Sequence, residues 1–324
     1  MLISVLLFAV GLVLLIKGGD WFVDGATGIA KRFNLPDIVV GATVVSIGTT
    51  LPEVMVSTTG ALQGSGAMAY GNAIGSIICN TALIAAISIT CNPGPVNVKS
   101  MKTPAIFFFG AAAIYCIAAY GLGTFPRWLG FIMLSVFVVY MIMTVRNGMK
   151  NPDAAAEEEE EAGKERKLWQ ELVLLVVGAA VIAVGADLLV EHGQIIAIGL
   201  GVPETVVALL FVALGTSLPE LVTTITSLRK GRASLGVGNV IGANVFNLVL
   251  VSGVAVSLAP FDVPVENELL NTGLNLSLVF DIPVMLGVMS LMIFPAMATK
   301  KLHRWQGILL LCIYAAFCVC QFML

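Results

Sequence analysis

Long apolar stretches alternate with short polar segments along the whole chain. A helix needs about 20 mostly apolar residues to cross a bilayer. The pattern predicts ten such helices, at residues 2–30, 38–63, 66–91, 104–120, 126–146, 168–196, 205–228, 232–259, 278–298 and 304–323. The first and the sixth are longer than a bilayer is thick, so we expect both to be tilted.

The composition excludes a soluble domain. Hydrophobic residues make up 58% of the 324 residues, charged residues make up 11%, and the mean hydropathy is +0.97. A soluble domain has about 25% charged residues. We therefore predict an all-α membrane protein that crosses the lipid bilayer many times. Its six cysteines lie in or beside apolar segments without a CxxC pair, and we interpret them as packing residues.

The basic residues predict the orientation. With the N-terminus outside, fifteen Lys and Arg residues fall in inside loops and only Arg127 falls in an outside loop. Cytoplasmic loops carry such an excess. We therefore expect a protein of the cell (inner) membrane with both termini outside and residues 147–167 in the cytoplasm. Five consecutive glutamates at 157–161 make this linker acidic, which is typical of a solvated connector, with a calcium-attracting segment as the alternative.

One motif occurs twice. Residues 41–53 read GATVVSIGTTLPE and residues 208–220 read ALLFVALGTSLPE, at an offset of 167 residues. The same offset pairs further polar residues without a gap: Asp20 with Asp187, Ser57 with Thr224, Asn72 with Asn239, and Asn80 with Asn247. So long an ungapped match indicates an internal duplication. We interpret the two aspartates as structural, with ion binding as the alternative.

Each half holds five predicted spans, and this odd number places the second half upside down relative to the first. The prediction divides the chain into 1–146 with its motif at 41–80, the linker 147–167, and 168–324 with its motif at 208–247. Inverted repeats are typical of secondary transporters, whose site lies at discontinuous helices near the midplane. Proline interrupts the hydrogen bonds of a helix, so we expect breaks at Pro52 and Pro219, in helices 2 and 7.

Glu53 and Glu220 are the acidic residues of the repeated motif, each within a predicted span. A charged group at the centre of a bilayer costs about 2.5–3.5 kcal/mol even on a lenient scale. A pair of protonated structural glutamates would avoid this cost, but the hydroxyl-rich context that recurs with both residues favours a bound cation. Two carboxylates balance one Ca²⁺, and they balance Na⁺ only as several ions together.

The residues around the glutamates supply oxygen ligands. Helix positions four apart share a face, which aligns Thr49 with Glu53 and Thr216 with Glu220. More oxygens come from Ser46, Ser57, Ser217, Thr224, Asn80 and Asn247, while Ala213 stands at the place that matches Ser46. A set without histidine or thiolate suits Ca²⁺ and Na⁺ and disfavours zinc or copper. If both ions use one site, their mutual exclusion couples the two fluxes.

In the pairing of Gly-Thr-Thr/Ser-Leu-Pro-Glu with Gly-Asn-x-Ile-Gly in both halves, the chain resembles the cation/calcium exchanger superfamily, specifically the prokaryotic sodium/calcium exchangers. The resemblance covers nearly the whole chain and implies ten helices in two inverted repeats. It implies Ca²⁺ ligands at Glu53, Glu220, Thr49 and Thr216. It implies Na⁺ or shared ligands at Thr50, Ser217, Ser76, Asn80 and Asn247, with backbone oxygens at Ser46 and Ala213. Two positions depart from the family, which has Asp in an archaeal type where Asn247 stands and often Ser where Ala243 stands.

These features predict a secondary active antiporter that exchanges Na⁺ for Ca²⁺ by alternating access. Coupling to H⁺ or K⁺ is the alternative within the class, and a passive cation channel or a membrane-embedded hydrolase would belong to other classes. Inverted repeats favour a transporter over a channel, and the absence of HExxH and GxSxG motifs argues against the enzyme. We expect no cofactor, no nucleic acid and no obligate protein partner, with Ca²⁺ and Na⁺ as substrates.

Overall fold

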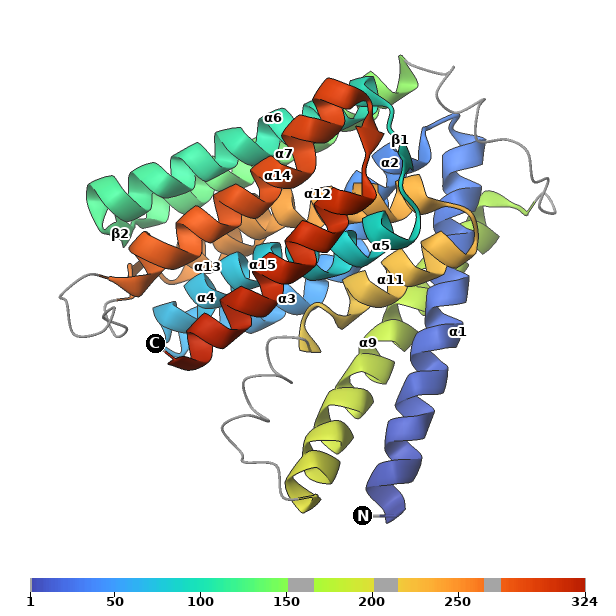
Figure 1. The fold of residues 1–324 in the computed structure, drawn as a ribbon, viewed down its shortest axis with the longest axis horizontal. Coiled ribbons are helices and arrows are strands. Elements are labelled where there is room, and N and C mark those ends of the chain that lie inside the picture. The colour runs from blue at the N-terminus through green and yellow to red at the C-terminus, as the bar shows by residue number, and fades with distance from the viewer. Residues whose placement is uncertain (1, 151–165, 201–214, 265–274, 324) are drawn as a thin grey trace.

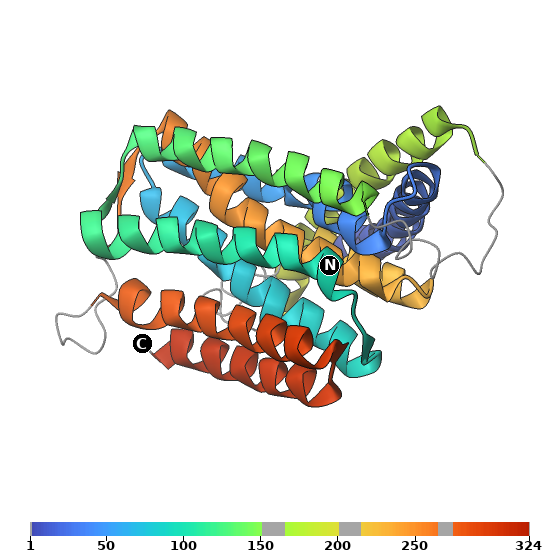
Figure 2. The same ribbon diagram turned by 90° about the horizontal axis from the view of Figure 1, so that it is seen from above.

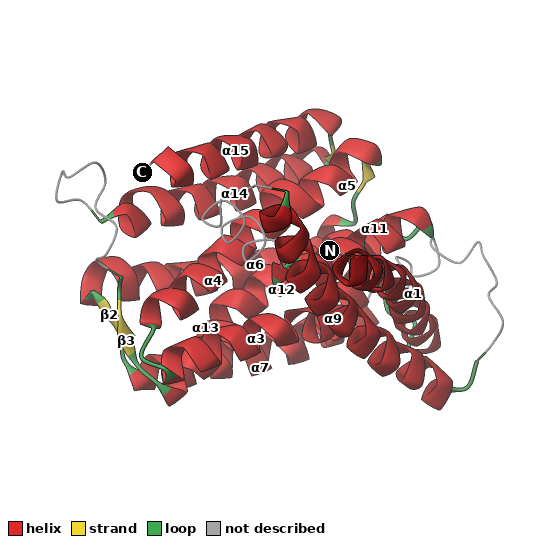
Figure 3. Ribbon diagram, turned by 90° about the horizontal axis from the view of Figure 1, so that it is seen from below, coloured by secondary structure: helices red, strands yellow, loops and turns green. Residues whose placement is uncertain are grey.

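The computed structural model describes residues 2–150, 166–200, 215–264 and 275–323. These residues are almost all helical, with short strands at the edges of the bundle (Figure 3). In this part of the chain the helices long and apolar enough to cross a membrane are Leu2–Arg32, Asp37–Leu62, Gly66–Cys91, Val98–Leu122, Arg127–Met149, Leu168–Ile196, Ala233–Leu258, Ser277–Thr299 and Arg304–Gln321. Of the predicted span 205–228, the part from residue 215 onward is described and contains α11 (Leu218–Arg229).

The helices that begin the two halves form an antiparallel pair, α1 (Leu2–Arg32) and α9 (Leu168–Gly199), which projects from the rest of the molecule (Figure 1). Glycines let their backbones approach closely. A Cβ atom added at Gly11 would lie 2.9 Å from the carbonyl oxygen of Gly185, and one at Gly25 would lie 2.6 Å from that of Glu171. Small residues serve this purpose in membrane helix pairs, where close packing replaces the hydrophobic effect.

The remaining helices run side by side in a bundle (Figures 1 and 2). From the first half come α2 (Asp37–Val40), α3 (Ser46–Leu62), α4 (Gly66–Cys79), α5 (Ala86–Cys91), α6 (Val98–Cys116) and α7 (Arg127–Met149). From the second half come α11, α12 (Ala233–Phe246), α13 (Ser252–Leu258), α14 (Ile282–Thr299) and α15 (Arg304–Met323). In the most apolar stretch of the span formed by α12 and α13, 89% of the residues are buried, against 17% for α15. The α12–α13 span therefore forms the centre of the bundle.

Several spans contain π-helical turns, which are η1 (Gly41–Val45), η2 (Asn80–Ala85), η3 (Ile117–Leu122), η4 (Asn247–Val251) and η6 (Ser277–Asp281). Two of them occupy matched places in the halves, because η2 begins at Asn80 and η4 begins at Asn247. Short π-helical segments inside α-helices are frequent at functional sites. The duplication therefore extends from the sequence to this local backbone geometry.

The predicted break at Pro52 is wrong, because α3 continues through this residue. A membrane helix tolerates proline where neighbouring groups and local π turns satisfy the freed backbone. The departure from α geometry lies upstream instead, in η1. In the second motif, residues 216–217 form a turn and α11 begins at Leu218. Pro219 thus stands in the first turn of a helix, where its missing N–H has no helical partner to lose.

The connecting loops meet in pairs. Strand β1 (Gly94–Pro95) pairs with β4 (Lys301–Leu302), and both belong to loops that the basic residues place inside. Strand β2 (Thr124–Phe125) pairs with β3 (Phe261–Asp262), and both belong to loops predicted outside. Each pair joins one loop from each half, so loops predicted to share a side of the membrane lie together.

Candidate functional site

Glu53 on α3 and Glu220 on α11 lie close enough to repel each other electrostatically. Both side chains are fully buried. Within the described part of the chain, none of their four carboxylate oxygens has a hydrogen-bond partner. Buried acidic groups without partners are strongly unfavourable unless a cation neutralises them. The fold thus brings together, one from each half, the two glutamates that the sequence indicated.

Five further predicted residues share this property. The side-chain oxygens or nitrogens of Thr50, Ser76, Asn80, Ser217 and Asn247 are buried and have no hydrogen-bond partner among the described residues. Each asparagine-bearing segment contacts the motif helix of the other half, because η2 packs against α11 and η4 packs against α3. Each motif helix therefore receives an asparagine-bearing segment from the other half. Unpaired buried amides and hydroxyls are the neutral oxygen ligands that Na⁺ and Ca²⁺ accept.

The two motif threonines have different surroundings. Thr49 is buried and lies beside Glu220, so it too reaches across to the other half. Its hydroxyl donates to Asn239 Oδ1 at 3.2 Å. Thr216 lies in the turn before α11 and is half-buried.

The Ser46 hydroxyl is engaged rather than free. It lies within hydrogen-bond distance of the Gly41 carbonyl oxygen at 2.8 Å, of the Asn239 carbonyl oxygen at 3.0 Å and of Asn239 Oδ1 at 3.2 Å. A hydroxyl has one proton to donate, and these acceptors hold it. Donation uses the proton and not the lone pairs, so the contributions of this hydroxyl and of its backbone oxygen to the cation site stay predictions. Ala213 lies outside the described residues.

Other residues near the site were not assigned a role from the sequence. Asn72 and Asn239 fasten helices to the first motif. The Cys79 thiol lies beside Ser217 and accepts a hydrogen bond from the Tyr314 hydroxyl at 3.7 Å. The repeated asparagine of Gly-Asn-x-Ile-Gly was the available signal for the first two. Nothing in the sequence distinguished Cys79 from the other apolar-segment cysteines.

A small cleft adjoins the site between the α1–α9 pair and the motif helices. Its walls are Phe22, Gly48, Thr49 and Pro52 from the first half and Ala179, Ile182, Ala183 and Pro219 from the second. Thr49 therefore borders both the cleft and Glu220.

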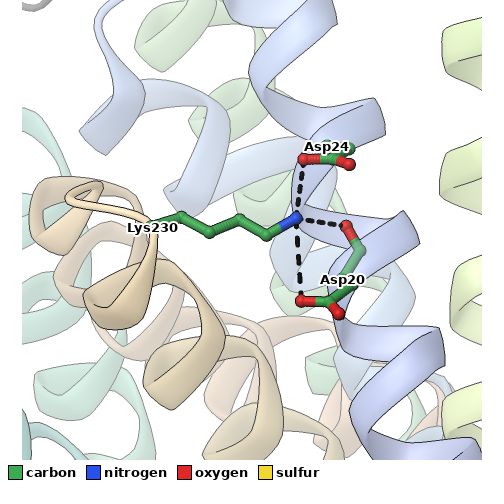
Figure 4. Close-up of polar contacts among 3 residues, drawn as sticks. All are labelled: Asp20, Asp24 and Lys230. Atoms are coloured by element: carbon green, nitrogen blue, oxygen red, sulfur yellow. Dashed lines mark hydrogen bonds and ion pairs between the residues drawn. The ribbon is translucent and has the colours of Figure 1, made fainter. Parts of the chain in front are cut away.

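An ion-pair cluster away from the glutamates joins α1 to the end of α11 (Figure 4). Lys230 Nζ lies 2.7 Å from Asp24 Oδ1 and 3.7 Å from Asp20 Oδ1, and it donates to the Asp20 carbonyl oxygen at 2.9 Å. Asp20 thus takes part in structural pairing. Within the described ranges no group of three His, Cys, Asp or Glu residues could hold a metal ion. Two glutamates among neutral oxygens are the acidic part of the candidate site.

The family model of the sodium/calcium exchanger protein matches residues 3–146 and 171–323, which covers both halves. The chain belongs to the sodium/calcium exchanger family. This family member is 33% identical over 307 residues to an uncharacterized membrane protein of Methanocaldococcus jannaschii, covering 95% of the chain and 94% of that protein. It is 29% identical to the sodium/calcium exchanger MaX1 of Methanosarcina acetivorans, covering 99% of each. A solved structure of the sodium-calcium exchanger NCX_Mj resembles it with a TM-score of 0.79 and 33% identity, covering 98% of each chain.

Proposed function

We propose that this protein is a secondary active antiporter that exchanges Na⁺ for Ca²⁺ by alternating access at one site between its halves. The observation that carries the proposal is the pair Glu53 and Glu220, which lie near each other, are fully buried and have no hydrogen-bond partner for their carboxylate oxygens among the described residues. Membership of the sodium/calcium exchanger family supports this choice of ions. The similarity to MaX1 and to NCX_Mj over almost their whole lengths adds to that support.

The proposed Ca²⁺ ligands are Glu53, Glu220, Thr49 and Thr216. Ca²⁺ takes 6–8 oxygen ligands, with carboxylates binding through one or two oxygens. The burial of the glutamates and the position of Thr49 beside Glu220 support three of these assignments. Thr216 is assigned because it matches Thr49 at the repeat offset of 167.

The proposed Na⁺ or shared ligands are neutral. They are the side chains of Thr50, Ser217, Ser76, Asn80 and Asn247, and the backbone oxygens of Ser46 and Ala213. The buried, unpartnered polar atoms of the five side chains support their inclusion. Neutral ligands let several Na⁺ ions share the two carboxylates, because each ion brings one positive charge.

Charge balance links the two fluxes. With Ca²⁺ bound, or with Na⁺ ions balancing the glutamates, the site is near neutrality and can be enclosed within the membrane. Without cations it carries two uncompensated carboxylates, which are expensive to enclose. Because only the cation-loaded site reorients, the protein exchanges one ion for the other and does not let either ion pass by itself.

We further propose ten helices in two inverted repeats, 1–146 and 168–324, joined by a cytoplasmic linker at 147–167, with both termini outside the cell membrane. The internal duplication and the pairing of β1 with β4 and of β2 with β3 support this arrangement. In a cysteine-free background, Glu160→Cys should escape a membrane-impermeant thiol reagent in intact cells, while Asp262→Cys should react. Labelling in the opposite sense would reverse the orientation.

Purified protein in proteoliposomes tests the exchange. We expect vesicles loaded with Na⁺ to take up Ca²⁺ against its gradient when Na⁺ is diluted outside. Vesicles loaded with K⁺, or with choline and a pH gradient, should take up little. Uptake driven equally by K⁺ or by the pH gradient would contradict Na⁺ coupling, and uptake without any driving gradient would indicate a channel.

A further inference from the structure

Asn72 ties two helices of the first half together. It lies on α4, and its Nδ2 donates to the Ser57 hydroxyl at 2.8 Å and to the Glu53 carbonyl oxygen at 3.2 Å, both on α3. These bonds stay within one half. They fix α4 against the turn of α3 that carries the glutamate.

Asn239, the repeat counterpart of Asn72, bonds to the other half instead. It lies on α12, and its Oδ1 accepts hydrogen bonds from Thr49 at 3.2 Å and from Ser46 at 3.2 Å. Its side chain is fully buried. Two asparagines at matched positions thus have different bonding patterns, one within a half and one between halves.

The second half holds an unused counterpart of the bond from Asn72 to Ser57. Its donor would be Asn239 and its acceptor would be Thr224. Thr224 corresponds to Ser57, and both asparagines stand fifteen residues after these hydroxyls. Asn239 Nδ2 and the Thr224 hydroxyl are both buried without a hydrogen-bond partner among the described residues. Thr224 faces α12, since a Cβ atom at Gly236 would lie 3.2 Å from Thr224 Cγ2. Gly236 precedes Asn239 by three residues, which puts both on one helix face.

The present bond of Asn239 sets the direction of a proposed calcium ligand. A threonine hydroxyl has one proton and two lone pairs. Because Thr49 gives its proton to Asn239 Oδ1, its lone pairs are left for a cation. Without that acceptor the hydroxyl would donate to the neighbouring Glu220 carboxylate and compete with the cation for it. Asn239 therefore orients Thr49 for binding.

We propose that Asn72 and Asn239 are positioning residues that exchange bonding patterns during transport. In the described state Asn239 orients Thr49 across the halves, while Asn72 is held within its own half. In the opposite state Asn239 bonds to Thr224, and Asn72 turns to Thr216, the counterpart of Thr49. The exchange of roles rests on the proposed alternating access, and each amide bonds to a different partner in each of the two states.

Exchange of isotope-labelled Ca²⁺ for unlabelled Ca²⁺ across proteoliposomes tests this proposal, since it needs both states and no particular coupling ion. Asn239→Ala should raise the half-saturating Ca²⁺ concentration about fivefold, because Thr49 loses its acceptor. Thr224→Val should lower the maximal rate about fivefold at unchanged half-saturation, because only the opposite state loses a bond. Thr223→Val is the matched control, as its hydroxyl bonds within α11 to the Pro219 carbonyl oxygen at 2.7 Å, and it should change neither value.

The test compares the effect of each variant on the half-saturating Ca²⁺ concentration with its effect on the maximal exchange rate. The proposal is overturned if Thr224→Val lowers the maximal rate no more than Thr223→Val, or if it shifts half-saturation instead. It is equally overturned if folded Asn239→Ala keeps the normal half-saturation. Should Asn239→Ala fail to fold, the two threonine variants still decide. Unmodified protein that exchanges Ca²⁺ for Ca²⁺ but ignores Na⁺ would contradict the proposed coupling ion and leave the roles of the asparagines standing.

Discussion

The two halves hold nearly the same motif in two backbone conformations. In the first half, η1 and α3 continue past Thr49 and through Pro52 to Leu62. In the second half, a turn at 216–217 separates the equivalent threonine from α11. Since the residues from the glycine to the glutamate differ at one position, Thr50 against Ser217, the motif itself does not dictate one geometry. The packing around it selects between two.

The segments that begin at the proposed amide ligands are alike by comparison. Asn80 and Asn247 each begin a π-helical segment, and each segment packs against the motif helix of the other half. The backbone conformations thus differ in the helices that bear the glutamates and agree in the segments that begin at Asn80 and Asn247.

Removal of one carboxylate tests whether the halves contribute equally to binding. Glu53→Gln and Glu220→Gln each leave one negative charge, which no longer balances Ca²⁺, and loss of one member of a buried charged pair costs several kcal/mol. We expect each to slow Ca²⁺ uptake into proteoliposomes by about 100-fold or more, with normal elution of the purified protein. Glu191→Gln, at an exposed carboxylate, is the control. Near-normal uptake by either variant would show that one half binds Ca²⁺ alone.

The motif glycines offer a test of the conformational difference. A Cβ atom at Gly48 would lie 2.8 Å from Phe22 Cζ, whereas one at Gly215 would lie 3.1 Å from Val190 Cγ2. Overpacking costs about 1–3 kcal/mol, so Gly48→Ala should lower the thermal unfolding midpoint more than Gly215→Ala. Adding Phe22→Leu should restore most of the loss. A larger loss from Gly215→Ala would mean that the second half is the more tightly packed one.

The one position that differs between residues 48–53 and residues 215–220 tests the proposed sodium ligands. Thr50→Ala and Ser217→Ala each remove a buried hydroxyl without a partner in the described structure. We expect each to raise the half-maximal Na⁺ concentration about fivefold, the equivalent of one hydrogen bond, with a smaller change for Ca²⁺. Thr59→Ala, an exposed hydroxyl on α3, is the control. Equal shifts for both ions would remove the distinction between sodium and calcium ligands.

The smallest effect concerns a contact found at the end of one motif helix. Lys230 pairs with Asp20 and Asp24, whereas the matched residue after α3 is the uncharged Gln63. Lys230→Gln makes the two positions the same and should cost about 0.5–1 kcal/mol, as expected for a partly exposed pair. Thermal unfolding at low salt measures this against Arg229→Gln, and the difference should shrink at high salt because exposed pairs are screened. A difference that persists in salt would mean that the contribution is not electrostatic.

The membrane class and the glutamate pair could be predicted from the sequence, because neither prediction depends on which residues pack together. Apolar length sets the spans, and an acid that recurs in one context within a membrane has few explanations. The unpartnered state of Asn80, Asn247 and Ser76 agrees with their predicted place in the site. These predictions needed no knowledge of how the side chains pack.

Predictions that depend on neighbours were less successful. The cost of Pro52 is decided by which groups satisfy the freed backbone, so the helix continues where the residue alone predicts a break. Helix periodicity placed the Ser46 hydroxyl on the face of Glu53 but did not show that Asn239 from the other half lies within hydrogen-bond distance of it. The π-helical turns of η2 and η4 were not predicted from the sequence. Asn239 lies far from its partners Ser46 and Thr49 in the sequence.

That separation also has a consequence in time. Thr49 and Ser46 bond to Asn239, which lies 190 and 193 residues further along the chain. At a synthesis rate of about 5–20 residues per second, the first motif leaves the ribosome roughly 10–40 s before the helix that completes its bonds. During this interval the nascent chain holds Glu53 in or near the bilayer with no Glu220 beside it. Slower translation between the two motifs lengthens the interval and gives membrane proteases more time to act on the unfinished protein.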